Sequence, residues 1–141
     1  MSELTIPGSE RILEAHLAPW IKELNIAFDY VGPDGAVLRI PPSPLLCRQG
    51  GTVCGQAIMA LADTAMIFAI AGIFGEFTAC TTVNQTSSFL RPAADADLVA
   101  RATIIKPGRT IIYGDVILHA GDPAKPAAKP VAHVTSTYML L

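Results

Sequence analysis

Apolar residues fill one long stretch near the middle of the chain. Between residues 57 and 74 only Asp63 and Thr64 interrupt a run of Ala, Ile, Leu, Met, Phe and Gly. An apolar run of this length without alternation predicts a helix that is buried all round by the rest of a folded domain. We expect this central helix over residues 52–74, between a glycine-rich loop and Gly75.

The N-terminal segment shows a helical pattern of a different kind. From Ile12 to Leu24 apolar residues recur every three or four positions, with polar residues between them. Ser9 is a suitable N-cap, because its hydroxyl can accept a hydrogen bond from the first turn. The pattern predicts an amphipathic helix over residues 9–24.

The remaining segments alternate in the manner of strands and are separated by Gly and Pro turns. We expect strands at 27–31, 36–40, 78–90, 97–106, 110–119 and 131–141. The strands after the central helix follow one another through short connections, which predicts antiparallel pairing between consecutive strands. Residues 1–141 therefore form one α+β domain of about six strands. The sheet must curve strongly to bury a helix about 30 Å long.

The same apolar run also reaches the lower length limit of a membrane span. Asp63 would cost about 2.5–3.5 kcal/mol near the centre of such a span. No Lys or Arg follows the run, where Gly75-Glu76 stands instead. We therefore favour a core helix and expect no membrane association.

Composition narrows the possible functions further. Only 16% of the 141 residues are charged and 51% are hydrophobic, which suggests that part of the surface is covered in an oligomer. The net charge of −2 and the lack of a basic tract argue against nucleic acid. Three cysteines without a C-x-x-C pair and three widely spaced histidines indicate no disulfide framework and no metal site. A reducing, cytoplasmic setting follows as the expectation.

Three segments carry a resemblance to a known family. They read R-Q-G-G-T-V-C-G-Q-A-I-M-A-L-A-D-T-A (48–65), T-V-N-Q-T-S-S-F-L-R-P-A (82–93) and L-V-A-R-A-T-I-I-K-P-G-R (98–109). Together they resemble the phenylacetate-degradation type of hotdog thioesterase, over about residues 36–141. The resemblance implies the hotdog fold, a curved antiparallel sheet wrapped round a central helix. It also implies hydrolysis of a small or aromatic acyl-CoA without a cofactor or metal, by dimers that pair into tetramers.

Three residues match the catalytic positions of that family. Gly55 would begin the central helix, where unpaired N–H groups and the helix dipole can polarise the thioester carbonyl. Asp63 would act either as a base on water or as a nucleophile. The resemblance gives Thr82 the role of holding the water. Structural roles remain open: Asp63 could cap another element, Gly55 could serve packing alone, and Thr82 could be a simple strand residue.

The motif departs from the family pattern at other positions. Arg48 replaces an asparagine that orients the substrate or water, and the neighbouring Gln49 could supply the missing amide. Cys54 replaces a histidine, and Gln56 replaces a glycine. Cys54 near a helix N-terminus could be a nucleophile, but no His or Asn partner is identifiable, so we expect a small buried residue. These losses keep a second function open, a non-catalytic protein that binds acyl-CoA or a small aromatic ligand.

Cations at strand ends could bind the phosphates of CoA, although each could equally be an ordinary exposed charge: Arg91, Lys106 and Arg109. Gly55 and Asp63, eight residues apart on one helix, would stand about 12 Å apart along its axis. One carbonyl cannot easily reach both. Two antiparallel copies of the helix in a two-fold dimer would place Gly55 of one chain opposite Asp63 of the other. The sequence therefore predicts a homodimer with composite sites.

Overall fold

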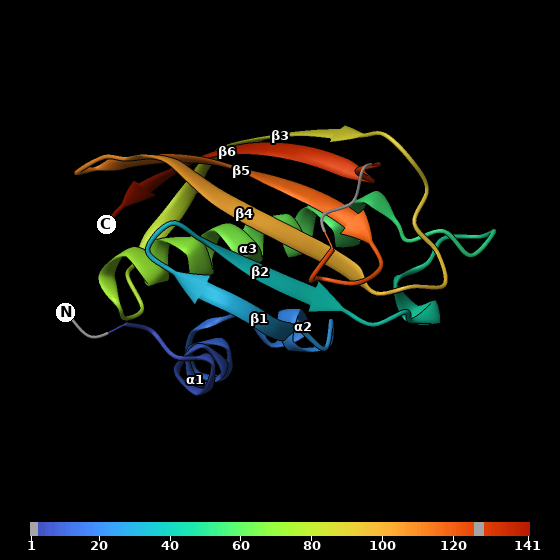
Figure 1. The fold of residues 1–141 in the computed structure, drawn as a ribbon, viewed down its shortest axis with the longest axis horizontal. Coiled ribbons are helices and arrows are strands. Elements are labelled where there is room, and N and C mark those ends of the chain that lie inside the picture. Colours follow the sequence, from blue (N-terminus) through green and yellow to red (C-terminus); the bar gives the residue numbers. More distant parts are fainter. Residues whose placement is uncertain (1–2, 126–128) are drawn as a thin grey trace.

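The computed structural model describes residues 3–125 and 129–141. Six antiparallel strands form one curved sheet, and one long helix lies in its concave side (Figure 1). This is the α+β architecture expected from the sequence. The elements are α1 (Ile6–His16), α2 (Pro19–Lys22), β1 (Ala27–Gly32), β2 (Gly35–Ile40), the 3₁₀ turn η1 (Pro44–Leu46), α3 (Gly55–Phe74), β3 (Cys80–Phe89), β4 (Leu98–Pro107), β5 (Ile111–Ala120) and β6 (Ala132–Leu140).

The strand order is β1-β2-β4-β5-β6-β3, so consecutive pairing after the helix is wrong for β3. β3 pairs with β6, from Cys80 opposite Leu140 to Phe89 opposite Ala132. The polarity of β3 explains its place, because its Thr, Asn, Gln and Ser residues are largely exposed and suit a sheet edge. The more apolar β4 and β5 occupy the centre.

The central helix α3 begins three positions later than predicted. Residues 52–54 are extended instead, because the Val53 N–H bonds to the Ala93 carbonyl and Val53 forms an isolated bridge with Cys47. The end of the helix agrees with the prediction: Gly75 adopts φ 75° in the left-handed region that terminates many helices. The start of α3 is therefore tied to the loop before it and to the segment after β3.

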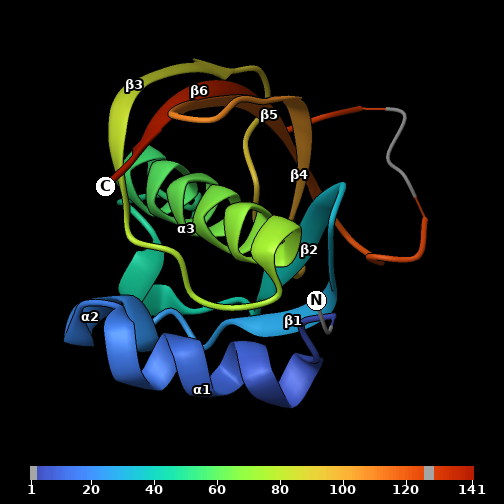
Figure 2. The same cartoon turned by 90° about the vertical axis from the view of Figure 1, so that its left-hand side faces the viewer.

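The helix is not buried all round, contrary to the expectation. Four residues spaced three or four positions apart retain exposure, and we call them the open stripe: Gln56, Met59, Asp63 and Ile67. The sheet curves over only one side of α3, while β1 and then α1 lie below it (Figure 2). A single chain therefore leaves one face of α3, including Asp63, incompletely covered.

By length and composition α3 could cross a membrane, since its mean hydropathy reaches 2.1 over an 18-residue window. However, 72% of that window is buried inside the protein. The ring of Phe68 packs edge-on against the ring of Phe28 of β1, with 4.6 Å between the ring centroids. A Cβ on Gly72 would stand 2.1 Å from the Gly32 carbonyl oxygen. Such close packing is typical of the core helix of a folded domain.

The N-terminal helix differs from its prediction at both ends. It begins at Ile6 because Thr5 is the N-cap, and Ser9 lies buried inside the helix with its hydroxyl donating to the Thr5 carbonyl. The predicted 9–24 helix is broken into α1 and α2. Pro19 causes the break, because proline excludes the helical conformation at the residue before it, and Ala18 has ψ 143°.

Candidate active site

Asp63 lies in the middle of α3, on the open stripe, and its half-buried carboxylate receives two hydrogen bonds from the sheet. The Thr82 hydroxyl of β3 donates to Oδ1 at 2.9 Å. The Tyr138 hydroxyl of β6 also donates to Oδ1 and lies 2.9 Å from the Asp63 carbonyl oxygen. Both donors hold the same oxygen, so Oδ2 accepts no hydrogen bond within the described part of the chain. The carboxylate is therefore oriented, with one oxygen available for chemistry.

The titratable neighbours of Asp63 are perturbed by it. Burial raises the pKa of the Tyr138 phenol, and the charge of Asp63 and the hydrogen bond to it raise the pKa further. Burial also raises the pKa of the Cys80 thiol on β3, with a smaller contribution from the charge of Asp63. Both groups therefore stay protonated at neutral pH.

The second part of the site is the first turn of α3. Cys54 is the N-cap residue and makes no side-chain capping bond. The N–H groups of Gly55 and Gln56 have no acceptor among the described residues, whereas those of Ala57 and Ile58 bond to the Cys54 carbonyl. Two unpaired N–H groups and the positive end of the helix dipole suit a developing oxyanion.

A cavity of about 490 Å³ opens at this first turn. Gly55 lines it together with Phe89 at the end of β3 and Pro92 just after that strand, and Arg48 and Arg91 lie in its wall. The Arg91 guanidinium donates to the Pro130 carbonyl at 2.8 Å, which fixes its position. The cavity thus combines apolar walls, unpaired N–H groups and two cations, a combination suited to an anionic ligand with an apolar part.

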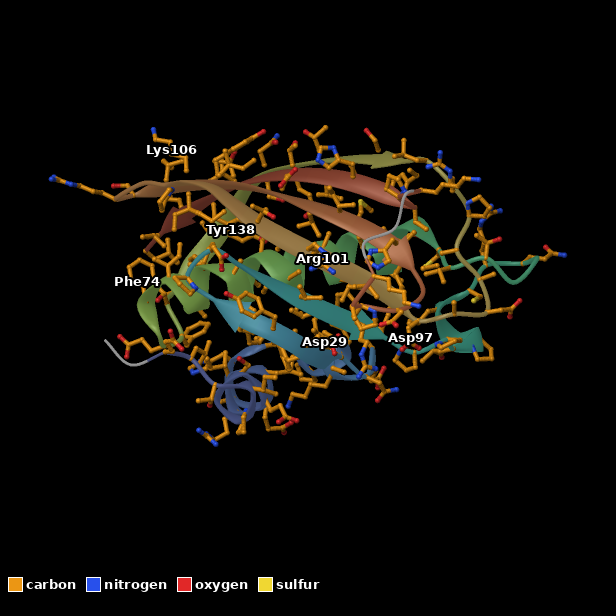
Figure 3. The ribbon with its side chains drawn as sticks, viewed as in Figure 1. Asp29, Phe74, Asp97, Arg101, Lys106 and Tyr138 are labelled. Carbon is orange, nitrogen blue, oxygen red and sulfur yellow. The ribbon has the colours of Figure 1, made fainter. Side chains whose placement is uncertain are left out.

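The other predicted site residues lie apart from this cavity. Cys54 and Gln56 line a separate, mostly apolar cavity of about 240 Å³ beside Trp20. Gln49 is exposed on the turn before α3 and is not part of the wall around Gly55. Lys106 and the nearby Arg109 lie at the opposite end of the molecule, where Lys106 shares that end with Phe74 of α3 (Figure 3).

Sequence reasoning missed two residues of the site, Tyr138 and Phe89. Tyr138 on β6 lies opposite Thr82 on β3. The contacts of both residues with Asp63 follow from the β3–β6 pairing, which the sequence did not reveal. The ring of Phe89 lies over Gly55 because β3 ends above the start of α3. The motif containing Phe89 was recognised, but its aromatic side chain gave no signal of where it would point. No cluster of metal-ligating side chains occurs within the described residues.

Comparison with known proteins shows which family this chain belongs to. Residues 50–127 match the thioesterase superfamily. A thioesterase family protein of Silicibacter pomeroyi is 25% identical, with a TM-score of 0.81 over 94% of each chain. Two further structures share the fold at lower identity. Thioesterase HI1161 of Haemophilus influenzae is 19% identical, with a TM-score of 0.84 over 99% of this chain and 92% of its own. A mutant of phenylacetic acid degradation protein PaaI of Thermus thermophilus is 24% identical, with a TM-score of 0.74 over 88% of this chain and 100% of its own.

These matches confirm the hotdog fold and the broader family expected from the motifs. The matched region contains α3 with Gly55 and Asp63, the strand that carries Thr82, and the central strands β4 and β5. An oriented carboxylate and unpaired N–H groups are parts that thioester hydrolysis requires. The chain belongs to the thioesterase superfamily and is a hydrolase of thioesters on a hotdog fold.

Proposed function

We propose that this protein hydrolyses the thioester of a small or aromatic acyl-CoA. The observation that carries the proposal is the carboxylate of Asp63, which Thr82 and Tyr138 hold in an otherwise apolar helix with Oδ2 left available. In the reaction, water adds its oxygen to the thioester carbonyl and the carbon–sulfur bond breaks. The products are a carboxylic acid and the CoA thiol, which leaves with a proton. The N–H group of Gly55 stabilises the oxyanion.

Asp63 can serve this reaction in two ways. As a base, Oδ2 takes a proton from the attacking water. As a nucleophile, Oδ2 attacks the carbonyl carbon, expels the thiolate and forms an anhydride, which water then hydrolyses. In both cases Thr82 holds the other carboxylate oxygen, and its exposed position beside Asp63 also suits a contact with the water.

The active unit in this proposal is a two-fold dimer with composite sites. Gly55 and Asp63 are eight residues apart on α3, which separates their backbones by about 12 Å along the axis. A second, antiparallel copy of α3 would bring its Asp63 to the Gly55 of the first chain. Two features favour such a copy: the open stripe leaves one face of α3 uncovered, and β3 is a ten-residue edge strand beside it.

The proposed dimer would also bring together cationic side chains that lie far apart in a single chain. Arg48 and Arg91 lie at the Gly55 end of α3, whereas Lys106 and Arg109 lie at the Phe74 end. Antiparallel pairing would bring the partner's Phe74 end toward the cavity at Gly55. The four cations would then meet the phosphates of one CoA. Pairing of dimers into tetramers would cover apolar side chains that remain on the outer face of the sheet, such as Ile117, 43% exposed.

We further infer that the protein is of the phenylacetate-degradation type and works in the cytoplasm. Gly55, Asp63 and Thr82 occupy the positions of that type, and the fold likeness to a PaaI protein is consistent with it. The free thiols of Cys47, Cys54 and Cys80 suit a reducing compartment. The aromatic ring of Phe89 beside Gly55 would favour a flat acyl group next to the carbonyl.

The replaced motif residues favour one alternative, a protein that binds acyl-CoA without hydrolysing it. Arg48 stands where the family asparagine would orient the substrate, and Cys54 stands where the family has histidine. In this alternative the cavity, the cations and the helix N-terminus retain a binding role. The carboxylate of Asp63 would then have no catalytic task.

One assay separates the two functions. The release of CoA thiol is measured with short-chain, long-chain and aryl acyl-CoAs, for the wild type and for Asp63→Asn. We expect hydrolysis by the wild type and its loss in Asp63→Asn. The matched control is Asp115→Asn, which removes a carboxylate that pairs with His133 on the outer face of the sheet. Saturable binding of an acyl-CoA without thiol release by the wild type would contradict the hydrolase proposal.

A further inference from the structure

We propose that Tyr138 is a positioning residue for the reaction: it fixes the carboxylate of Asp63 so that Oδ2 faces the substrate. This role rests on the function proposed above. Tyr138 does not belong to the resemblance motifs and contacts the reacting atoms only through Asp63. Its assignment comes from three observations, namely its place in the sheet, its contacts with Asp63 and its burial.

The place of Tyr138 in the sheet is set by pairing on both sides. On β6 it lies opposite Thr82 of β3 and opposite Ile112 of β5. All three positions face α3, so the Tyr138 ring extends across the sheet toward the helix between two neighbouring strands. Figure 3 shows Tyr138 on the helix side of the strands. Rigid strands, rather than a loop, therefore carry both donors to Asp63.

The contacts of Tyr138 constrain Asp63 at two points. The phenol hydroxyl donates to Oδ1 and lies 2.9 Å from the carbonyl oxygen of the same residue. One group is therefore close to both the backbone and the side chain of Asp63, which limits rotation of the carboxylate. Thr82 donates to Oδ1 as well. With Oδ1 engaged by two donors, Oδ2 is the oxygen that can accept a proton or attack.

The burial of Tyr138 favours a persistent hydrogen bond to Asp63. Tyr138 is only 1% exposed, and a buried hydroxyl is costly unless it has a hydrogen-bond partner. Because burial raises the pKa of the phenol, Tyr138 remains a donor over the whole working range of the enzyme. A donor to a carboxylate stabilises the charged form. Tyr138 therefore keeps its hydrogen bond to the Asp63 carboxylate throughout that range.

Few other titratable groups surround Asp63. Asp63 is the only charged residue of α3. Among the described residues, the titratable groups that face it are Tyr138 from β6 and Cys80 from β3. The pKa of Cys80 is raised by burial, so this thiol is neutral on the acidic side of the pH profile.

The test compares Tyr138→Phe with Tyr113→Phe, a matched control on the outer face of the sheet, by pH profiles of kcat and kcat/KM. A purely structural role for Tyr138 would lower thermal stability without moving the profile. The positioning role predicts that kcat falls about tenfold while KM stays within twofold. A profile and a kcat equal to those of Tyr113→Phe would overturn the proposal.

A second measurement decides the question even if Tyr138→Phe does not fold. The chain contains three tyrosines, so the double substitution Tyr30→Phe, Tyr113→Phe leaves Tyr138 alone for labelling with 3-fluorotyrosine. The ¹⁹F shift of this residue should move in Asp63→Asn, because its hydroxyl donates to the carboxylate of Asp63, and should stay unchanged in Asp115→Asn. A shift that Asp63→Asn does not alter overturns the role of Tyr138. Absence of thiol release by the wild type would instead overturn the proposed function itself.

Discussion

The ring of Phe89 lies directly over Gly55, and a Cβ built on this glycine would stand 3.3 Å from the ring. The two residues belong to the end of β3 and the start of α3. A larger side chain at position 55 must push the ring away or fill the space in front of the unpaired N–H groups. Gly55 is therefore a suitable place to disable the oxyanion site without touching Asp63.

This relationship permits a test of the composite site. Gly55→Val and Asp63→Ala chains, each with its own affinity tag, are unfolded and refolded together, and dimers that carry both tags are purified. We expect each variant alone to be inactive. Each mixed dimer should regain about half of the wild-type activity, because one site carries both defects and the other carries none. Mixed dimers that form but remain inactive would rule out sites shared between chains.

The substitution Asp63→Ala should remove turnover and spare the fold. We expect kcat to fall by at least about a hundredfold, the usual scale of a lost general base. The Tyr138 hydroxyl keeps the carbonyl oxygen at position 63 as an acceptor, so no buried donor is left unpaired. Thermal unfolding by circular dichroism, together with the thiol-release assay, checks both halves of this prediction. Residual turnover within tenfold of the wild type would remove Asp63 from the mechanism.

The thiol of Cys54 should be dispensable. Cys54 faces the apolar cavity beside Trp20, not the cavity that contains Gly55, and the proposed chemistry uses no thiolate. Cys54→Ser is therefore expected to hydrolyse acyl-CoA within a few-fold of the wild-type rate. Cys80→Ser, which alters a thiol beside Asp63, is the control. A folded but completely inactive Cys54→Ser would indicate covalent catalysis by cysteine.

Close packing between α3 and β1 should make Gly72 sensitive to the smallest enlargement. The Cβ of Gly72→Ala would lie 2.1 Å from the Gly32 carbonyl oxygen, so backbone must shift, at a cost of about 1–3 kcal/mol. Gly8→Ala in α1 is the control. Its Cβ meets only side-chain atoms, the nearest at 3.0 Å, and alanine is the better helix former. Urea unfolding should show a clear loss for Gly72→Ala and a change below about 1 kcal/mol for Gly8→Ala.

The buried phenol of Tyr138 should make the fold sensitive to alkali. Its pKa is raised in the folded state, whereas a tyrosine in the unfolded chain ionises near pH 10. Below that pH both states hold the proton, and the contribution to stability is complete. Above it only the unfolded state loses the proton, so this group lowers the free energy of unfolding by up to about 1.4 kcal/mol per pH unit.

Urea unfolding between pH 8 and 11 measures this dependence. Tyr138→Phe should lose stability less steeply than the wild type above pH 10, and Tyr113→Phe should follow the wild type, because Tyr113 is 37% exposed. Equal slopes for Tyr138→Phe and the wild type would show that ionisation of this phenol does not limit stability.

Local signals in the sequence were sufficient for the central helix and for most strands. The apolar run and Gly75 located α3 to within three residues at its start and matched its end, and alternation located six strands to within a few residues. Pro19 is a signal for a helix break in the sequence. The helical spacing of apolar residues from Ile12 to Leu24 nevertheless led to the prediction of one continuous helix. Here the backbone constraint of proline outweighed the periodicity.

The residues of the candidate site also fall into those that the sequence identified and those that it did not. Asp63 was identifiable because it is a lone carboxylate in an apolar helix, and Gly55 was identifiable only through the resemblance of its motif to the family. Tyr138 was not identifiable, because its contact with Asp63 depends on which strand neighbours β3. The pairing of distant strands is decided by the whole fold and leaves no mark on the residues nearby.

The pairing of β3 with β6 also determines when, during synthesis of the chain, the hydrogen bonds around Asp63 can form. Ribosomes add residues from the N-terminus, so α3 and β3 are synthesised before β6. Until then β3 has no neighbour in the sheet, and Tyr138 has not been added to the chain. A nascent chain thus presents Asp63 without the Tyr138 donor, and the hydrogen-bonded arrangement around this carboxylate is complete only after translation has passed through β6.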